Sequence, residues 1–441
     1  MILSIRGFKS IQELREFKFS PLTMLTGINS SGKTSLIQTL LLLKQTLESE
    51  TKEVLRINGK YISTEDEHDL VRGKQETDQF EFVIELDDNE LSLQDGYRKD
   101  YITHLKYKVD FHVNSGVYVH SIDSDLLLGG NKVGVDLSEQ KDEFIGNNYQ
   151  INLRHLKMMM GNEEIDFSTP FSVSFSNFFP DYAFRSDGST NPLTIKVPYM
   201  EEIKTMISSF FSHIYYVGPL RVKPDPIISY TSSNIKDVGA DGKYTRFVLH
   251  NMRDVKVNDQ ETLIEATHRW ICNNMKLAES LVTTTDGTNS YRVILRNRGL
   301  DVDLCHMGLG VSQVLPIIVQ GLLVPKGGML IVDSPEVHMH PSIQAVLVDF
   351  FIELSKSGRF VVIETHSDHI ITRLRRRVAE GLDPKMINLC FVSDSRSGST
   401  YKTLDIDDKG YFFGSLPPGF MDTQDEDFRE IVKQRFNTLQ K

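Results

Sequence analysis

The segment GINSSGKT, residues 27–34, decides the fold class of this chain of 441 residues. The apolar stretch SPLTMLTG leads into it, and TSLIQTLLLLKQTL, residues 34–47, follows it as a helix. A loop of this pattern between a strand and a helix binds phosphates, because its glycines let backbone N–H groups turn inward and the helix N-terminus adds its positive end. A chance match at a strand–helix turn is the competing interpretation, which this context disfavours.

The loop and the first helical turn supply the candidate nucleotide ligands. We expect Lys33 to reach the β- and γ-phosphates of ATP and Thr34 to hold Mg²⁺. The full set of candidates is Gly27, Asn29, Ser30, Ser31, Gly32, Lys33, Thr34 and Ser35.

A second segment, MLIVDSPEVHMHP at residues 329–341, carries two acids. Asp333 ends an apolar strand, and ligands bind at that edge of open α/β sheets. Asp333 is therefore the candidate acid that binds Mg²⁺ through water, and Glu336 is the candidate general base or water-positioning group. A helix-capping acid and a solvated glutamate are the plain alternative, which the presence of Lys33 disfavours.

Two further segments fit a site of this kind. His366 follows the apolar strand in VVIETHSDH, 33 residues after Asp333, although a lone histidine after a strand is more often structural. Residues 306–313, HMGLGVSQ, precede a helix, and their glycines and serine are able to bind an anion. Helix starts rich in glycine, with a serine cap, are also common without a ligand. The candidates here are Gly308, Gly310, Ser312 and Gln313.

The rest of the chain divides into a β-rich middle and an alternating C-terminal part. Segments such as QFEFVIEL, HLKYKVDFHV and GVYVHSI alternate as the strands of hairpins do. From residue 291 strands and helices alternate, which predicts a mostly parallel sheet covered by helices. We expect an ATPase core from residues 1–50 and 211–441, with a β-rich insertion or subdomain at 51–210. No heptad pattern runs through the insertion, so a long coiled coil is not expected.

Composition narrows the class of protein. A net charge of −11 argues against a generally basic nucleic-acid coat. The three cysteines lie far apart without a CxxC pair, so no zinc ribbon or disulfide framework is indicated. No signal peptide is visible, and the apolar stretches at 36–43 and 314–324 are too short or too interrupted to span a bilayer. We expect a cytoplasmic protein without a membrane partner.

The ordered set GINSSGKT, HMGLGVSQVLP, LIVDSPEVHMHP and ETHSDH resembles the ABC-type ATPase heads of SMC, RecF and OLD proteins. More closely, HIYYVGPLR, DVGADGKYT, ETHSDHIITRLRRR and PPGFMD resemble a bacterial group of AAA family ATPases with a C-terminal domain of unknown function. Members of this group occur in anti-phage defence operons, and the ATPase subunits of Septu and PARIS are of this broad type. The resemblance covers the first 50 residues and those from 212 onward.

The resemblance implies an ABC-type P-loop head, with an antiparallel β subdomain and an inserted mixed α/β region. It also implies that two copies pair around two ATP molecules, because Ser312 and its glycines would touch the γ-phosphate held by the opposite copy. His340 then occupies the place of the D-loop aspartate. Ser334 stands where transporter-type heads have an acid after Asp333, and no clear Q-loop glutamine is found, although residues 68–73 lie where one is expected.

Three basic or acidic features leave alternatives open. Arg221 in VGPLR either stabilises phosphate charge or forms a structural ion pair. The run Arg373, Arg375, Arg376 and Arg377 either contacts DNA or RNA phosphates or is the solvated face of a helix. The acids at 405–408 match DxD in letters only, and the chain lacks the acidic cluster of a Toprim nuclease.

Three functions therefore compete. The first is an ATPase switch or sensor, dimeric and anti-phage, that controls a separate nuclease or toxin effector. The second is a DNA-repair or DNA-clamp ATPase. The third, the energising subunit of a transporter, is disfavoured by Ser334 and by the missing Q-loop.

Overall fold

The computed structural model describes residues 1–51, 53–73, 78–87, 91, 102–114, 116–128, 130–140, 148–154, 158–160, 163–165, 167, 170–185, 193–223, 235–285, 290–414, 416–418 and 420. The chain forms two compact units. Unit 1 holds Met1–Lys18, Thr34–Ile214 and Ser395–Thr400, and unit 2 holds Phe19–Lys33, Tyr215–Asp394 and the described residues from Tyr401 onward. Within the described ranges, no helix has both the length and the apolar character that a bilayer crossing requires.

Unit 2 is built on a six-stranded sheet whose order is β14-β18-β19-β3-β20-β21 among the described residues. Its neighbouring strands β18, β19, β3 and β20 pair in parallel. The strands are β3 (Leu22–Gly27), β14 (Ile214–Val217), β18 (Met329–Asp333), β19 (Phe360–Glu364), β20 (Ile387–Ser393) and β21 (Thr400–Thr403). Apolar runs such as MLIVD and FVVIE are buried along almost their whole length, as strands with both faces covered require.

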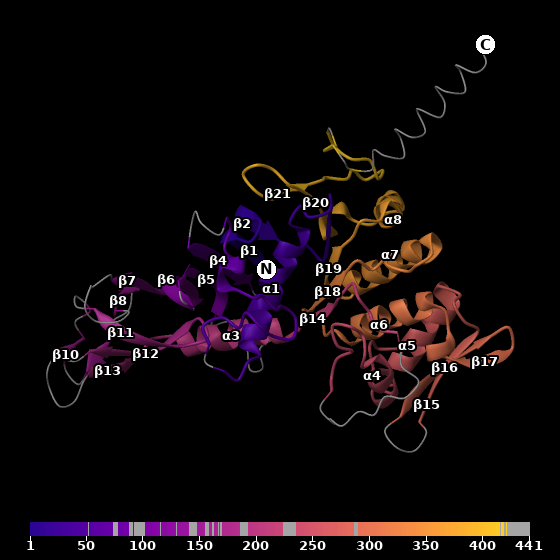
Figure 1. The fold of residues 1–441 in the computed structure, drawn as a ribbon, viewed down its shortest axis with the longest axis horizontal. Coiled ribbons are helices and arrows are strands. Elements are labelled where there is room, and N and C mark those ends of the chain that lie inside the picture. The colour runs from indigo at the N-terminus through magenta and orange to yellow at the C-terminus, as the bar shows by residue number, and fades with distance from the viewer. Residues whose placement is uncertain are drawn as a thin grey trace, which may run out of the picture. The chain divides into compact units, whose positions relative to one another are not determined.

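Helices pack on this sheet and beside it. They are α4 (Thr245–Asn251), α5 (Leu263–His268), α6 (Leu309–Leu323), α7 (Pro341–Lys356) and α8 (Asp368–Ala379), with the short turns η3 (Leu304–His306) and η4 (Pro384–Met386). In Figure 1, α6, α7 and α8 lie beside β18 and β19. Their buried apolar side chains join those of the strands in one core that includes Trp270, Phe350 and Phe391.

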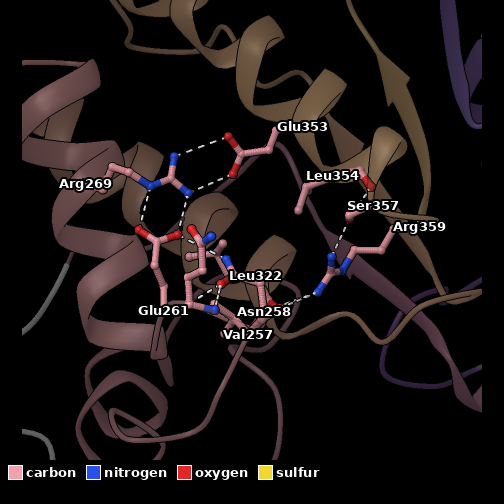
Figure 2. A network of polar contacts seen from close by, with 10 residues as sticks. Val257, Asn258, Glu261, Arg269, Leu322, Glu353, Leu354, Ser357 and Arg359 are labelled. Carbon is pink, nitrogen blue, oxygen red and sulfur yellow. Dashed lines mark hydrogen bonds and ion pairs between the residues drawn. The ribbon is translucent and has the colours of Figure 1, made fainter.

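A small antiparallel sheet in unit 2 consists of β15 (Ser280–Thr285), β16 (Tyr291–Asn297) and β17 (Leu300–Asp303). It follows the π-helical turn η2 (Arg269–Asn274), where Arg269 binds Glu261 and Glu353 through its guanidinium group. Arg359, which follows α7, donates to the carbonyl oxygens of Val257 and Val324. Arg269 and Arg359 thus link the segment around residue 260 to α7 and to the residues that adjoin α7 (Figure 2).

Unit 1 is dominated by an antiparallel sheet in the order β13-β12-β11-β8-β7-β6-β5-β4-β1-β2, ten strands within the described ranges. The strands are β1 (Ile2–Phe8), β2 (Ile11–Lys18), β4 (Gln79–Asp87), β5 (Ile102–Val113), β6 (Val117–Leu128), β7 (Asn131–Gln140), β8 (Asn148–Arg154), β11 (Phe171–Ser176), β12 (Phe179–Arg185) and β13 (Leu193–Lys196). The short pair β9 (Met159–Met160) and β10 (Glu163–Glu164), the turn η1 (Glu67–Leu70) and helices α1 (Lys33–Leu47) and α3 (Met200–Ser212) complete the described elements.

Aromatic side chains form much of the core of unit 1. Phe80 stacks on Phe111 with ring centroids 4.9 Å apart, and Phe178 and Phe179 lie 4.6 Å apart. The leucines of α1 are buried, as its broad apolar surface predicts. The ammonium group of Lys44, on α1, donates to the backbone oxygen of Phe211 at the end of α3.

The predicted fold class is confirmed: a P-loop follows β3 of a mostly parallel sheet, an antiparallel β region is present, and no long coiled coil occurs in the described residues. Apart from the short pair β9 and β10, the described strands of the middle segment do not form a sheet of their own, because β4 pairs with β1 and continues the sheet that β1 and β2 begin. The boundaries at residues 50 and 210 stay predictions.

Candidate functional site

The P-loop, residues 27–33, has the backbone geometry of a phosphate cradle. Gly27 has a φ of 136°, and a Cβ atom there would lie 2.0 Å from the carbonyl oxygen of Val392 on β20. Gly32 and Ser30 also have positive φ values, of 102° and 61°. The glycine positions of the motif are thus required by the backbone, since a side chain at Gly27 would collide with the neighbouring strand.

Lys33 is buried at the start of α1, with an exposed fraction of 3%. Its ammonium group donates to the carbonyl oxygens of Gly27 and Ile28, at 3.0 and 2.6 Å. Burial lowers the pKa of Lys33, and the negative charges of Glu364, Asp333 and other acids partly offset this. A buried cation that bonds only to its own loop is well placed to exchange those two bonds for bonds to phosphate oxygens.

Asp333 lies where β18 ends and is paired in register with Glu364 at the end of β19. Burial raises the pKa of Asp333, and a hydrogen bond from the Ser334 hydroxyl, at 2.8 Å, opposes this. Ser334 has a φ of 47°, and its N–H group donates to the Glu364 carbonyl. Ser334 therefore donates a hydrogen bond to the Asp333 carboxylate, and its left-handed backbone conformation ends the strand.

Glu336 joins the loop after β18 to the loop after β19. One of its carboxylate oxygens accepts the hydroxyl of Thr365 and the other accepts the backbone N–H of His366, both at 2.8 Å. The carboxylate keeps further lone pairs for a water molecule, because each oxygen accepts two hydrogen bonds. No motif pointed to Thr365, whose hydroxyl bonds to the candidate base.

His366 is solvent-accessible at the same edge. Partial burial of its ring, together with the charge of Lys33, lowers the pKa of His366. Its imidazole is therefore neutral at pH 7 and able to donate one hydrogen bond and accept another. Lys33 interacts electrostatically with Asp333, Glu336 and His366, so these four predicted site residues lie near one another.

Arg221 and Tyr216 also belong to this edge of unit 2. Arg221 is 5% exposed and donates to the carbonyl oxygen of Ser334, while its Nε and Nη1 have no partner among the described residues. Burial lowers the pKa of Arg221 to about 10, against the attraction of Glu336 and Asp333. Burial and the charges of Asp333 and Glu364 raise the pKa of Tyr216, which also hydrogen-bonds to Asp333. Among the described residues Arg221 has no ion pair within 4.0 Å but is attracted by Glu336 and Asp333, and its role beside a phosphate stays a prediction. No sequence pattern singled out Tyr216.

The segment before α6 exposes its backbone and buries its serine. Gly308 and Leu309 are exposed, whereas Ser312 is 3% exposed and donates its hydroxyl to the Leu309 carbonyl. Gln313 is buried and donates to the backbone oxygen of Arg221. The exposed part of this segment is therefore the helix start at Gly308 and Leu309, and the Ser312 hydroxyl bonds to its backbone; the ATP-binding roles of Gly308, Gly310, Ser312 and Gln313 stay predictions.

Other predicted residues have structural partners. Ser35 shares a hydrogen bond with Ser10 in unit 1, and Thr34 is exposed in the first turn of α1. His340 caps α7 by accepting the N–H of Ser342. At residues 68–73, Arg72 donates to the carbonyl oxygen of Ser397. None of these contacts bears on ATP binding, so the ATP-binding roles of Thr34 and Ser35 stay predictions.

The arginines of α8 and the carboxylate of Asp407 have partners within unit 2. Arg373 and Arg377 both bind Asp349, Arg376 binds Glu380, and Arg375 donates to the Gly410 carbonyl and lies over the ring of Phe412. Asp407 accepts the N–H groups of Lys409 and Tyr411, so its side chain supports a turn. These bonds favour the structural interpretation of the arginine run over nucleic-acid contact.

Comparison with protein families gives two matches. Residues 221–371 match the family described as "AAA ATPase domain". Residues 22–111 match the family described as "AAA domain, putative AbiEii toxin, Type IV TA system". No curated protein matches the chain. The two segments that carry the P-loop and the Asp333 strand are therefore similar to AAA-type ATPase domains.

Among solved structures, the chain is similar to SMC heads. An SMC head bound to the C-winged helix domain of ScpA has 12% identity and a TM-score of 0.48, covering 92% of this chain and 97% of that one. The SMC head domain from Thermotoga maritima has 10% identity and a TM-score of 0.39, with 92% and 98% covered. An SMC head with an extended coiled coil bound to the C-terminal domain of ScpA, derived from Pyrococcus furiosus, has 12% identity and a TM-score of 0.47, with 92% and 96% covered.

Proposed function

We propose that the chain binds ATP with Mg²⁺ and hydrolyses it at the carboxyl edge of the parallel sheet in unit 2. The observation that carries this proposal is that buried Lys33, at the end of a P-loop whose glycines have positive φ values, shares one sheet edge and its electrostatic interactions with Asp333, Glu336 and His366. ATP hydrolysis needs a cradle for phosphates, an acid for Mg²⁺ and an acceptor near the attacking water, and these residues are of those types.

The polar atoms at this edge fit a polyphosphate. The Ser31 hydroxyl is buried without a partner among the described residues, as are two nitrogens of the Arg221 guanidinium. Buried donors without partners cost free energy, and phosphate oxygens would satisfy them. Asp333 and Thr34 would hold Mg²⁺, which supplies charge that neutralises the phosphates.

Each residue has a separate part in the proposed reaction. Lys33 and Ser31 bind the phosphates, and Arg221 places positive charge beside them. Glu336 accepts the proton of the attacking water or positions that water, while Thr365 fixes its carboxylate. Neutral His366 donates a hydrogen bond to the γ-phosphate.

We further propose a dimeric switch in which the start of α6 of one copy completes the site of the other. The exposed helix start at Gly308 and Leu309 supports this, because N–H groups at a helix start attract anions. ATP would then favour pairing and hydrolysis would release it, so that the output is conformational. The partners are a second copy and a separate effector protein.

For the biological role we propose anti-phage defence through a nuclease or toxin effector. The resemblance to defence ATPases and the match of residues 22–111 to a family described with a toxin of a toxin–antitoxin system support this role. A DNA-repair or DNA-clamp ATPase is the alternative. Purification of the chain with the products of neighbouring genes, with and without ATP, separates the two: an effector that co-purifies supports defence, and a recombination protein supports repair.

The catalytic proposal is tested by phosphate release from ATP. The wild-type chain should release phosphate only when Mg²⁺ is present, and Asp333→Asn should remove that activity because a neutral amide binds Mg²⁺ poorly. Asp254→Asn, in an exposed ion pair with Arg253, is the matched control and should keep the wild-type rate. Equal rates in wild type and Asp333→Asn would contradict the proposed site.

A further inference from the structure

A cluster of two histidines and a glutamate lies in unit 1, outside the proposed ATP site. His112, His120 and Glu139 come from the adjacent strands β5, β6 and β7. One ligand atom from each side chain lies within 4.8 Å of the other two. All three residues are half-buried, so that they are held by the sheet and still open to solvent. No role in ATP binding uses any of them.

The local fold directs these side chains to one place. Strands β5 and β6 form a hairpin in which His112 pairs with Tyr118. The register then shifts by one residue: Phe111 pairs with Val119, whereas Asp110 pairs with Ser121, so His120 has no partner position on β5. His120 is therefore the extra residue of a β-bulge, and bulges turn a side chain away from the direction that regular pairing gives it.

Hydrogen bonding and ring geometry bring the ligand atoms near the spacing a metal ion needs. Nδ1 of His120 lies 3.0 Å from a carboxylate oxygen of Glu139, and the rings of His112 and His120 have centroids 6.2 Å apart at 79°. Two ligand atoms on a tetrahedral zinc ion lie about 3.3 Å apart, from metal–ligand distances of about 2.0–2.1 Å. Small side-chain rotations thus suffice to place all three on one ion.

A fourth residue beside the cluster supplies an independent observation. Asp110 is 7% exposed, and its Oδ1 has no hydrogen-bond partner among the described residues. Its other oxygen accepts only a long bond of 3.4 Å from Arg6, and the carboxylate interacts electrostatically with His120. Histidines that bind metals commonly donate their second N–H to a carboxylate, and Asp110 is a buried carboxylate on the same strand as His112 with an acceptor oxygen to spare.

We propose that His112, His120 and Glu139 form a binding site for a divalent transition-metal ion, with water in the remaining position or positions. Two imidazoles and one carboxylate suit Zn²⁺ and other first-row ions, and they do not suit Mg²⁺ or Ca²⁺, which take oxygen ligands. The ion would replace the proton shared by His120 and Glu139 and would link three strands of the sheet. The proposal is independent of the proposed ATPase function.

Metal binding is measured on the full chain, stripped of metal and free of nucleotide and Mg²⁺. Zn²⁺ is titrated against a chromophoric chelator, and Co²⁺ is added separately for its absorption spectrum. Wild type should bind one Zn²⁺ per chain at this site, and Zn²⁺ should raise its melting temperature because it binds the folded state. His120→Ala and Glu139→Gln should each weaken the binding by more than about tenfold.

The matched control is His104→Ala. His104 lies on the same strand, β5, and contacts Asp87 at 2.9 Å with no third ligand among the described residues, so that its removal should leave Zn²⁺ affinity unchanged. If His120→Ala does not fold, His120→Asn retains a polar side chain at the bulge and is measured instead. Far-UV circular dichroism of the metal-free variants establishes which of them folds.

Two results would overturn the site. The first is Zn²⁺ binding by a folded His120 variant with wild-type stoichiometry and affinity. The second is a thiolate-to-cobalt charge-transfer band in the Co²⁺ complex, which would assign the ion to cysteine instead. A spectrum of nitrogen and oxygen ligands that is lost in His120→Ala and kept in His104→Ala supports the proposal.

Discussion

At the scale of single residues, the site combines a buried cation with acids that other side chains hold in place. Lys33 bonds to its own loop, Asp333 accepts from Ser334, and Glu336 accepts from Thr365 and from the His366 backbone. Transporter-type heads have an acid at the position of Ser334. In this chain the Ser334 hydroxyl donates a hydrogen bond to the Asp333 carboxylate. The proposed base is therefore Glu336, whose carboxylate bonds to the neighbouring loop.

Replacement of Lys33 by alanine should weaken ATP binding by about 10- to 150-fold, because hydrogen bonds to charged groups contribute about 1.5–3 kcal/mol. Calorimetric titration with ATP and Mg²⁺ measures the affinity. Lys326→Ala, at an exposed position in the turn before β18, is the control and should bind as wild type does. Unchanged ATP affinity in Lys33→Ala would contradict the proposal that the P-loop binds ATP.

Replacement of Glu336 by glutamine should preserve ATP affinity and lower the turnover number by about a hundredfold or more, the usual contribution of a general base. The glutamine oxygen still accepts the His366 N–H, whereas its amide accepts no proton from water. Thr365→Val, which removes only the hydroxyl that orients the carboxylate, should reduce turnover less. Phosphate release under saturating ATP distinguishes these outcomes, and wild-type turnover in Glu336→Gln would place the base elsewhere.

At the scale of elements, the strand ends and helix starts of unit 2 determine what is accessible. Asp333 at the end of β18 pairs in register with Glu364 at the end of β19. Helix α6 is exposed at its start and buried from Val311 to Leu322. Helices α7 and α8 are joined by Asp349, which binds Arg373 and Arg377. The arginines of α8 therefore hold two helices together.

Replacement of Leu309 by arginine tests the α6 start with less disturbance than a change at Ser312. Leu309 is 44% exposed, whereas arginine at Ser312 would force a charge into the core. We expect Leu309→Arg to keep ATP affinity within about threefold and to lose most hydrolysis, because its bulk and charge would lie where the second copy binds. Leu300→Arg, at a 68% exposed leucine in β17, is the control. Full activity in Leu309→Arg would exclude α6 from the composite site.

The link between α7 and α8 predicts a pH dependence of stability. Burial alone would raise the pKa of Asp349, but hydrogen bonds from Arg377 and Arg373 bring it below its usual value. Because the folded pKa is the lower one, this stabilisation is present above the unfolded pKa of about 3.9 and is lost as the pH falls through the folded pKa. Asp349→Asn should therefore lower the free energy of unfolding by about 1–3 kcal/mol at pH 7.

Urea unfolding at pH 7 and pH 3 measures this difference in stability between wild type and Asp349→Asn. The difference should shrink at pH 3, which lies below the unfolded pKa of about 3.9, because the unfolded chain takes up a proton at this carboxyl group there. A difference of equal size at both values would show that the contact acts through packing alone.

Sequence patterns predicted the local features of this chain better than its long-range pairing. The P-loop, the apolar strands and α1 follow from residues adjacent in sequence, and the structure has them at the expected positions. The burial of Ser312, the Arg221 contact with Ser334 and the Thr365 bond to Glu336 join residues far apart in sequence. Strand order in the ten-stranded sheet likewise depends on non-local pairs, which alternating hydrophobicity leaves undetermined.

At the scale of the whole molecule, the proposed composite site needs two copies of the chain. In this proposal each copy contributes the P-loop with Asp333, Glu336 and His366, and each offers the exposed start of α6 to its neighbour. In a two-fold pair both sites are completed at once. A mixture of Lys33→Ala and Leu309→Arg chains should therefore recover part of the activity, since one mixed pair contains one intact composite site.

The most direct test of the central claim is the molar mass of Glu336→Gln by light scattering without nucleotide, with ADP and with ATP, each with Mg²⁺. This variant should retain ATP long enough for the pair to accumulate. We expect the mass of one chain without nucleotide and with ADP, and twice that mass with ATP, because the γ-phosphate is part of the interface. A mass of one chain under all three conditions, together with ATP hydrolysis by a monomeric wild type, would contradict the composite site.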